Sequence, residues 1–204
     1  MTEIIEPHPL LIEYWQICNQ LDYNSDGGKQ EFIDAGQWHY VPTHLEKTIF
    51  LFKRLEEVNL LPNKLDICDL GIGLGSTMYD LYLQSKEYPN IKFTFTGIEL
   101  WKPYIDYVNQ NLIKYWEGNL DLICDDIMNA DIGKYNFIWF YQPFKVSDKA
   151  INFYHKVITE SKPDTLIFGL NTYQIQTYGD DKIKEDFSKL QQYILDDLVI
   201  YKKV

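Results

Sequence analysis

Three glycines alternate with single residues directly after an apolar, strand-like segment of the chain. Residues 67–75 read ICDLGIGLG, so Asp69 precedes Gly71, Gly73 and Gly75. Glycine in a regular element costs roughly 0.5–1 kcal/mol relative to alanine, so the bare backbone must serve a purpose here. At a strand–turn–helix corner, the first glycine permits a tight turn, the second lets a ligand approach, and the third lets the next helix pack close to the strand. The free N–H groups at the start of that helix favour a polar ligand.

A second acid, Glu99, ends the candidate strand IKFTFTGIE at 91–99. A carboxylate at a strand tip can accept hydrogen bonds from the two vicinal hydroxyls of a ribose. Binding sites for several adenosine-containing ligands have an acid at this place. Glu99 therefore indicates a ligand with an adenosine part but does not identify which one. A solvated strand-end acid is the plainer alternative. Trp101, two residues on, either walls the same pocket or is a core ring.

The elements that must position these residues alternate between short apolar strands and helices from Lys64 onward. Strands at this spacing predict βαβ units and a doubly wound, mostly parallel α/β sheet. The candidate strands are 65–70, 91–99, 120–125, 136–141 and 165–170, and the candidate helices are 75–86, 102–116 and 147–160, with a short turn near 127–134. The last segment, KLQQYILDDLVIYKKV, favours two strands turning at Asp196–Asp197 over a helix and a strand.

The first sixty residues differ from this alternating pattern. Apolar spacing predicts a helix over 9–21, and YNSDGGKQ at 23–30 is a loop signal. Thr43, with a glutamate three places on, predicts the capped start of one long amphipathic helix that reaches Val58. We therefore divide the chain into a helical N-terminal extension or lid over 1–62 and a Rossmann-like domain over 63–204.

The run D-L-G-I-G-L-G resembles motif I of the class I S-adenosylmethionine-dependent methyltransferases, D/E-x-G-x-G-x-G. The resemblance implies a seven-stranded sheet and a glycine loop under the methionine part of S-adenosylmethionine, whose product is S-adenosylhomocysteine. It also implies that Asp69 helps to hold the amino group, directly or through water. The dinucleotide pattern G-x-G-x-x-G/A fits less well, because Ser76 occupies its sixth place.

Two acids follow the third candidate strand, which reads LDLICDD. The family usually has an acid here, beside the amino group of adenine, and the resemblance assigns this place to Asp126, with Asp125 as the competitor. Capping of the next turn is the alternative for either acid.

The segment Y-Q-P-F at 141–144 partly resembles motif IV of amine-methylating members, D/N-P-P-Y/F/W. Pro143 and Phe144 match, whereas Tyr141 and Gln142 do not. The resemblance makes Tyr141 and Phe144 our candidates for the catalytic residues at the substrate mouth. The alternative is that both are ordinary aromatic residues in the loop after a strand. The missing amide or carboxylate weighs against methylation of a base amine.

The stretch GQWHYVPT at 36–43 resembles the segment that precedes the glycine motif in several of these enzymes. The resemblance implies that Tyr40 and Thr43 contact the methionine end of the cofactor, and that Trp38 and His39 form a lid. A helix cap with core aromatics is the alternative.

Composition limits the partners. The net charge is −11 and Arg54 is the single arginine, which disfavours tight binding to nucleic acid. No apolar run is long enough for a membrane span, and the first residues lack a basic signal-peptide region. Three scattered cysteines fit reduced thiols in a cytoplasmic protein, and Cys68 and Cys124 are expected in buried strands. No metal-ligand spacing joins the histidines and cysteines, so no metal is expected.

The sequence therefore predicts a cytoplasmic S-adenosylmethionine-dependent methyltransferase that acts on a small molecule or a protein side chain. Methyl transfer needs little acid–base chemistry, so the lack of a catalytic triad does not oppose it. A protein that binds S-adenosylmethionine or S-adenosylhomocysteine without turnover is the alternative, motivated by Y-Q-P-F. An NAD-linked oxidoreductase is the remote one. The methyl acceptor and the oligomeric state stay open.

Overall fold

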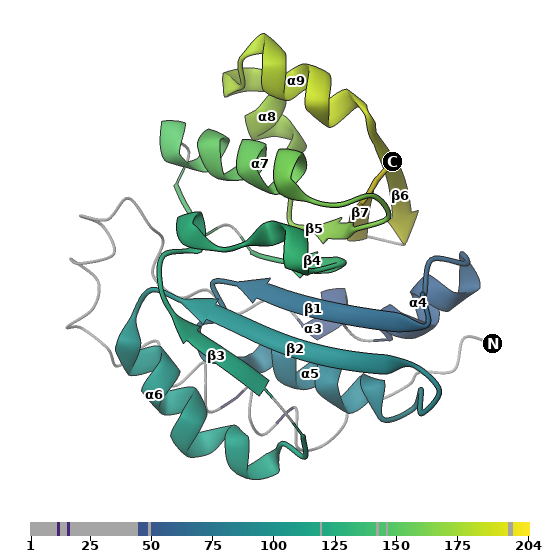
Figure 1. Cartoon of the computed structure of the whole chain (residues 1–204), viewed down its shortest axis with the longest axis vertical. Coiled ribbons are helices and arrows are strands. Elements are labelled where there is room, and N and C mark those ends of the chain that lie inside the picture. Colours follow the sequence, from purple (N-terminus) through teal and green to yellow (C-terminus); the bar gives the residue numbers. More distant parts are fainter. Residues whose placement is uncertain are drawn as a thin grey trace.

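The computed structural model shows seven strands in one sheet with helices on both faces (Figure 1). The residues that it describes are Ile12, Gln16, 45–48, 50–118, 120–141, 143–145, 147–195 and 198–204, with side chains of the 45–48 segment from Lys47 on.

The sheet has the strand order β3-β2-β1-β4-β5-β7-β6. The strands are β1 (Lys64–Leu70), β2 (Lys92–Glu99), β3 (Leu120–Cys124), β4 (Phe137–Trp139), β5 (Leu166–Phe168), β6 (Leu190–Leu195) and β7 (Leu198–Lys203). β1 to β5 pair in parallel, and β7 runs antiparallel between β5 and β6. The predicted doubly wound, mostly parallel sheet is confirmed. Because parallel strands end at one edge, the sequence signals after β1, β2, β3 and β4 meet at that edge, called here the C-terminal edge.

Helices cover both faces of this sheet. They are α3 (Leu45–Thr48), α4 (Leu51–Glu57), α5 (Ser76–Ser85), α6 (Lys102–Asn111), α7 (Asp148–Glu160), α8 (Thr172–Tyr178) and α9 (Asp181–Ser188), with 3-10 turns η1 (Ile113–Tyr115), η2 (Ile127–Asn129) and η3 (Ile132–Lys134). α4, α5 and α6 lie on one face, whereas α7, α8 and α9 lie on the other (Figure 1).

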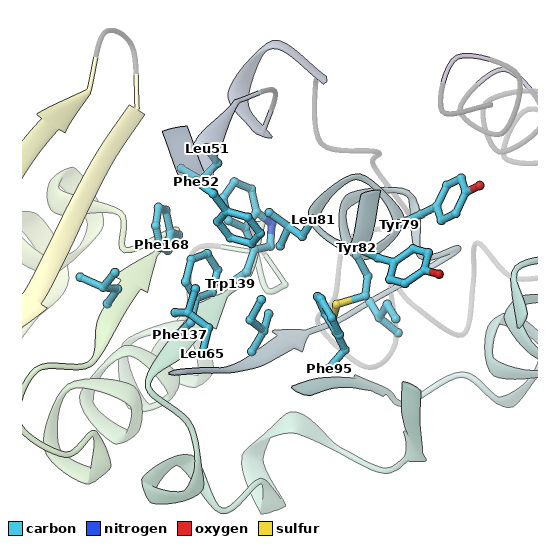
Figure 2. Close-up of a cluster of buried hydrophobic side chains, with 14 of the residues drawn as sticks. Leu51, Phe52, Leu65, Tyr79, Leu81, Tyr82, Phe95, Phe137, Trp139 and Phe168 are labelled. Atoms are coloured by element: carbon cyan, nitrogen blue, oxygen red, sulfur yellow. The ribbon is translucent and has the colours of Figure 1, made fainter. Parts of the chain in front are cut away.

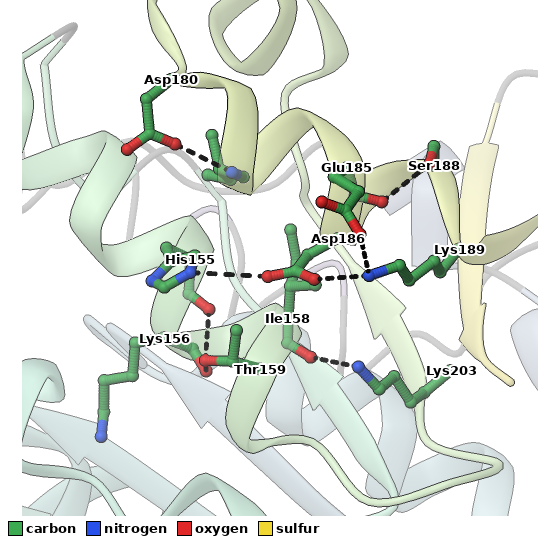
Figure 3. A network of polar contacts seen from close by, with 11 residues as sticks. His155, Lys156, Ile158, Thr159, Asp180, Glu185, Asp186, Ser188, Lys189 and Lys203 are labelled. Carbon is green, nitrogen blue, oxygen red and sulfur yellow. Dashed lines mark hydrogen bonds and ion pairs between the residues drawn. The ribbon is translucent and has the colours of Figure 1, made fainter.

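Each strand divides its side chains between two buried cores. In β1, Leu65 and Ile67 pack into the core beneath α4, α5 and α6, part of which Figure 2 shows. Cys68 and Leu70 pack into the other core, beneath α7, α8 and α9. Alternation places Asp69 on the side of Leu65 and Ile67. Burial on both faces explains why these strands read as nearly continuous apolar runs.

The prediction of one continuous helix from Thr43 to Val58 is wrong, because this stretch contains two separate helices, α3 and α4. Phe50 has a left-handed backbone, with φ of 56°, and separates α3 from α4. The apolar spacing is helical on both sides of this residue, which is why the break left no mark in the pattern. α4 places Leu51, Phe52 and Leu55 in the core, so packing of this apolar face stabilises the second helix.

Three further differences concern the second half of the chain. α8 and α9 were not predicted, although Asn171 and Asp180 cap them by accepting the N–H groups of Gln174 and Ile183. Cys124 was expected to be buried and is exposed, because β3 is an edge strand, whereas Cys68 is buried as expected. The final pair of strands is confirmed as β6 and β7, while the turn at 196–197 lies outside the described residues.

The described part of the chain has neither a helix suited to a membrane nor a cluster of metal-ligating side chains. None of its helices combines the length and the apolar character that a membrane crossing requires. The described residues contain no group of three or more histidine, cysteine, aspartate or glutamate side chains that could hold a metal ion.

Candidate functional site at the C-terminal edge of the sheet

The glycine loop after β1 adopts a backbone that favours glycine at all three positions. The φ angles are 90° at Gly71, 54° at Gly73 and 80° at Gly75. The N–H groups of Gly71 and Ile72 both donate to the carbonyl oxygen of Ile98, at 2.8 and 3.1 Å, and so attach the loop to the end of β2. Left-handed backbone strains residues with a Cβ, so the conformation accounts for this run of glycines.

Close packing adds a second reason at Gly75, which caps α5. A Cβ built there would lie 2.9 Å from Cδ2 of Leu112 and 3.5 Å from Cγ2 of Val108. These neighbours belong to α6 and the residue after it, so the third glycine allows α6 to approach the start of α5.

Glu99 is buried and holds the loop from the tip of β2. Its Oε2 accepts the N–H of Gly73 at 3.0 Å, and its Oε1 accepts the N–H of Trp101 at 3.0 Å. Burial raises the pKa of Glu99, while the backbone N–H groups that face it act in the opposite direction. Each carboxylate oxygen keeps a second lone pair for a ligand hydroxyl.

Asp69 lies near the end of β1, just before the glycine loop, and is 3% exposed. Among the described residues, none forms a hydrogen bond with its carboxylate. Burial, with a smaller contribution from the charge of Glu99, raises the pKa of Asp69 to about 8. Because burial disfavours the charged form of this acid, a cationic or hydrogen-bond-donating group beside it would stabilise the carboxylate.

The acids after β3 already have structural partners. Asp126 accepts the N–H of Met128 at 2.9 Å, which caps η2, and its Oδ2 lies 3.3 Å from Nζ of Lys149 on α7. Asp125 is exposed and accepts from the N–H of Asp126 at 2.7 Å and from the amide of Asn129 at 2.9 Å. The capping alternative therefore applies to both acids, and the assignment of Asp126 to adenine stays a prediction.

The segment after β4 lies beside the glycine loop. The Cβ of Pro143 is 3.9 Å from the place where a Cβ of Gly71 would stand. Tyr141 is partly exposed at the end of this strand region. Phe144 is 1% exposed and packs edge-on against Phe153 of α7, with ring centroids 5.5 Å apart. Of our two candidates for the substrate mouth, Phe144 is a core ring here, and Tyr141 is the one that reaches solvent.

Sequence reasoning missed two residues at this edge. Leu100, directly after Glu99, is 41% exposed and offers an apolar surface next to the ribose candidate. Gly97 in β2 faces the glycine loop so closely that a Cβ there would lie 2.2 Å from Cδ1 of Ile72. A glycine inside an otherwise β-branched and aromatic strand was the available signal, since it often marks a close approach.

Several predicted site residues cannot be placed. Tyr40 and Thr43, together with Trp38, His39 and Gln142, lie outside the described residues. Trp101 is described, and it packs edge-on against Tyr104 of α6 with ring centroids 4.4 Å apart. Trp101 therefore packs at the start of α6 against the hydrophobic core, as the alternative to a pocket wall predicted.

Solved structures resemble the chain over 80% or more of its length. A structure from Listeria monocytogenes assigned to the class I S-adenosylmethionine-dependent methyltransferases is 14% identical, with a TM-score of 0.58, over 99% of this chain and 72% of that one. A methyltransferase from Podospora anserina, bound to S-adenosylhomocysteine, is 14% identical, with a TM-score of 0.58, over 96% and 88%. An RNA methyltransferase from Salinibacter ruber, in complex with S-adenosyl-L-homocysteine, is 14% identical, with a TM-score of 0.50, over 80% and 92%.

Neither protein-family models nor the sequences of curated proteins match the chain. At 14% identity, the likeness to solved structures concerns the arrangement of elements. The seven-stranded, mostly parallel sheet with its antiparallel β7 and with helices on both faces is this arrangement. The chain therefore has the fold of the class I S-adenosylmethionine-dependent methyltransferases.

Proposed function

We propose that the chain is an S-adenosylmethionine-dependent methyltransferase that acts on a small molecule or a protein side chain. One observation carries the proposal: the buried carboxylate of Asp69 has no hydrogen-bond partner among the described residues, although it lies directly before the glycine loop. A buried acid of this kind needs a donor, and the ammonium of the methionine part supplies one.

The other residues at the C-terminal edge fit the remainder of the same ligand. Glu99 can accept from the ribose hydroxyls with the free lone pairs of its two oxygens. Leu100 supplies an exposed apolar surface for a flat base, and Asp126 stays our candidate for its amino group. At Gly71 a built Cβ would lie 3.9 Å from Cβ of Pro143, so the segment after β4 is in van der Waals range of the glycine loop.

S-adenosylmethionine supplies an electrophilic methyl group on a sulfonium, so the protein is needed mainly to bind and align. Asp69 and Glu99 would fix the two polar ends of the ligand from β1 and β2. The segment after β4 approaches the glycine loop through Pro143 and would hold the acceptor over it. In this arrangement, Tyr141 is the side chain that contacts the acceptor.

Isothermal titration calorimetry of the full chain with S-adenosylhomocysteine tests the proposal. We expect saturable binding, weakened about tenfold or more in Asp69→Asn because the charge-assisted hydrogen bond is lost. Asp66→Asn is the matched control, since Asp66 lies on the same strand but pairs with Lys64 at the surface, at 2.6 Å. Absence of binding at millimolar ligand, or equal losses in the two variants, would remove the proposal.

A binding protein without turnover is the second candidate. The observation that favours it is the side chain at the end of β4, where a tyrosine replaces the short acceptor of amine-methylating enzymes. Transfer of a labelled methyl group from S-adenosylmethionine to any member of a broad acceptor panel would exclude it. A fluorescence titration with NADH addresses the remote oxidoreductase alternative, for which we expect no binding.

A further inference from the structure

We infer that Lys47 selects a methyl acceptor that carries an anionic group, a carboxylate or a phosphate, beside the atom to be methylated. This inference rests on the proposed function, because it concerns the acceptor side of the same site. It begins from the contact between α3 and the segment after β4, where Nζ of Lys47 lies 5.2 Å from the centroid of the Tyr141 ring.

The backbone of α3 holds Lys47 in place. Thr48, the next residue, is 1% exposed, and its carbonyl oxygen accepts the side-chain amide of Gln84 at 2.8 Å. Gln84 lies on α5, and its Oε1 also accepts the N–H of Phe52 at 3.2 Å. Since α5 begins at the glycine loop, these bonds hold the backbone beside Lys47 in position relative to that loop.

The ring beneath this ammonium lies at the acceptor side. Tyr141 follows β4 by two residues, and Pro143 lies against Gly71 of the glycine loop. An acceptor held over the cofactor would therefore meet the ring of Tyr141 and the ammonium of Lys47 together. A cation over an aromatic ring contributes little at an exposed site and leaves the positive charge uncompensated.

The described part of the chain places no carboxylate against the ammonium of Lys47. No described acid lies within ion-pair distance of Lys47, whereas the ammonium of Lys149 on α7 pairs with Asp126 at 3.3 Å. The whole chain carries 30 acids against 19 basic residues, so its net field repels anions. A partly buried ammonium at the acceptor side, which pairs with no described acid, is the local feature that would reverse this repulsion.

The contact between Lys47 and Tyr141 limits the chemical class of the acceptor further. An ammonium has three donors that can rotate toward a carboxylate or phosphate oxygen, while the face of Tyr141 packs against a flat or apolar group. A small aromatic or conjugated acid combines both features. A nucleic-acid acceptor would need several cations along its backbone, whereas the net charge of this chain is −11.

The test uses fluorine NMR of the full chain saturated with S-adenosylhomocysteine, with 4-fluorobenzoate, 4-fluorobenzamide and 4-fluorophenyl phosphate as probes. We expect the two anions to bind roughly tenfold more tightly than the amide. Lys47→Met should abolish this preference and leave the S-adenosylhomocysteine affinity unchanged, and Lys47→Arg should restore it. The benzoate and phosphate arms show which anion the site prefers.

Lys53→Met is the matched control, because Lys53 is exposed on α4 and keeps the total charge of the Lys47 variant. Equal binding of the anions and the amide would overturn the inference, as would an anion preference that survives in Lys47→Met or tighter binding of a short single-stranded RNA. Failure of the proposed function is seen separately, as the absence of S-adenosylhomocysteine binding to the unmodified chain.

Discussion

Glu99 accepts the backbone N–H of Gly73 at 3.0 Å, which joins the tip of β2 to the middle of the glycine loop. The other oxygen of the same carboxylate accepts the N–H of Trp101 at 3.0 Å, just before α6. One buried side chain therefore sets the position of the loop after β1 relative to the helix after β2. The acid that we expect to bind ribose also shapes the loop that binds the rest of the ligand.

Glu99→Ala should consequently weaken binding of S-adenosylhomocysteine more than the loss of one ligand contact would. It removes the ribose acceptor and leaves two backbone N–H groups without their partner, each at a cost of about 1–3 kcal/mol when buried. We expect the dissociation constant to rise by a factor of about 100, measured by calorimetry. Glu57→Ala, an exposed acid at the end of α4, should leave it unchanged. An equal effect of the two substitutions would contradict this role.

The pKa of Asp69 makes the stability of the ligand-free protein depend on pH. The folded-state pKa is about 8, above the ordinary value of 3.8, so folding favours the neutral acid. The free energy of unfolding should therefore decrease as pH rises from about 4 to about 8, and then level off. Asp69→Asn mimics the neutral form and should be more stable than the parent at pH 8 by a few kcal/mol, since each pKa unit corresponds to about 1.4 kcal/mol.

Urea unfolding of both proteins at pH 5, 6.5 and 8 measures this difference. Asp80 on α5 provides the comparison, because burial raises its pKa only to about 6, against hydrogen bonds from Thr48 and Gln84 that lower it. The gain from Asp80→Asn should stop growing near pH 6, whereas the gain from Asp69→Asn should continue to pH 8. Identical pH profiles would show that the two acids are not distinguished by their surroundings.

The same carboxylate should link cofactor binding to proton release. At pH 7 the ligand-free Asp69 is mostly protonated, and an ammonium bound beside it favours the charged form. Binding of S-adenosylhomocysteine at pH 7 should therefore release up to about one proton, and Asp69→Asn should release none. Calorimetry in two buffers of different ionisation enthalpy gives the number. The same proton release from both proteins would place the titrating group elsewhere.

The strands and the glycine loop could be predicted because their signals are local. Apolar runs of five to nine residues, separated by helical spacing, correspond to β1 to β5 and to α5, α6 and α7. The three glycines and the acids at strand ends predicted which edge of the sheet carries the candidate site, since parallel strands end together.

The features that were missed depend on contacts between segments. The left-handed residue at Phe50 lies inside a helical apolar pattern, so no local signal shows that α3 and α4 are separate. Phe144 was read as a mouth residue because its motif position suggested it, but its ring enters the core against Phe153 of α7. Cys124 is exposed only because β3 is at the edge of the sheet, which the strand sequence does not reveal.

Gly97 provides a prediction about contact between β2 and the glycine loop. In Gly97→Ala, the new Cβ would stand 2.2 Å from Cδ1 and 3.2 Å from Cβ of Ile72, so Ile72 and the loop backbone must shift. We expect a loss of about 1–3 kcal/mol in the free energy of unfolding, together with weaker binding of S-adenosylhomocysteine. Gly133→Ala is the control, because Gly133 has no left-handed backbone and its Cβ would lie 3.4 Å from the carbonyl oxygen of Glu160, which is an ordinary contact distance.

A second substitution separates overpacking from other causes. Ile72→Val removes Cδ1, the atom that the new methyl group of Gly97→Ala would strike first. By itself it should cost about 0.5–1.5 kcal/mol of stability, as is usual for this exchange in a core. Combined with Gly97→Ala, it should recover part of both the stability and the affinity, giving a positive coupling in the double-mutant cycle. Strictly additive losses would mean that Gly97 acts through the conformation of β2 itself and not through the position of the glycine loop.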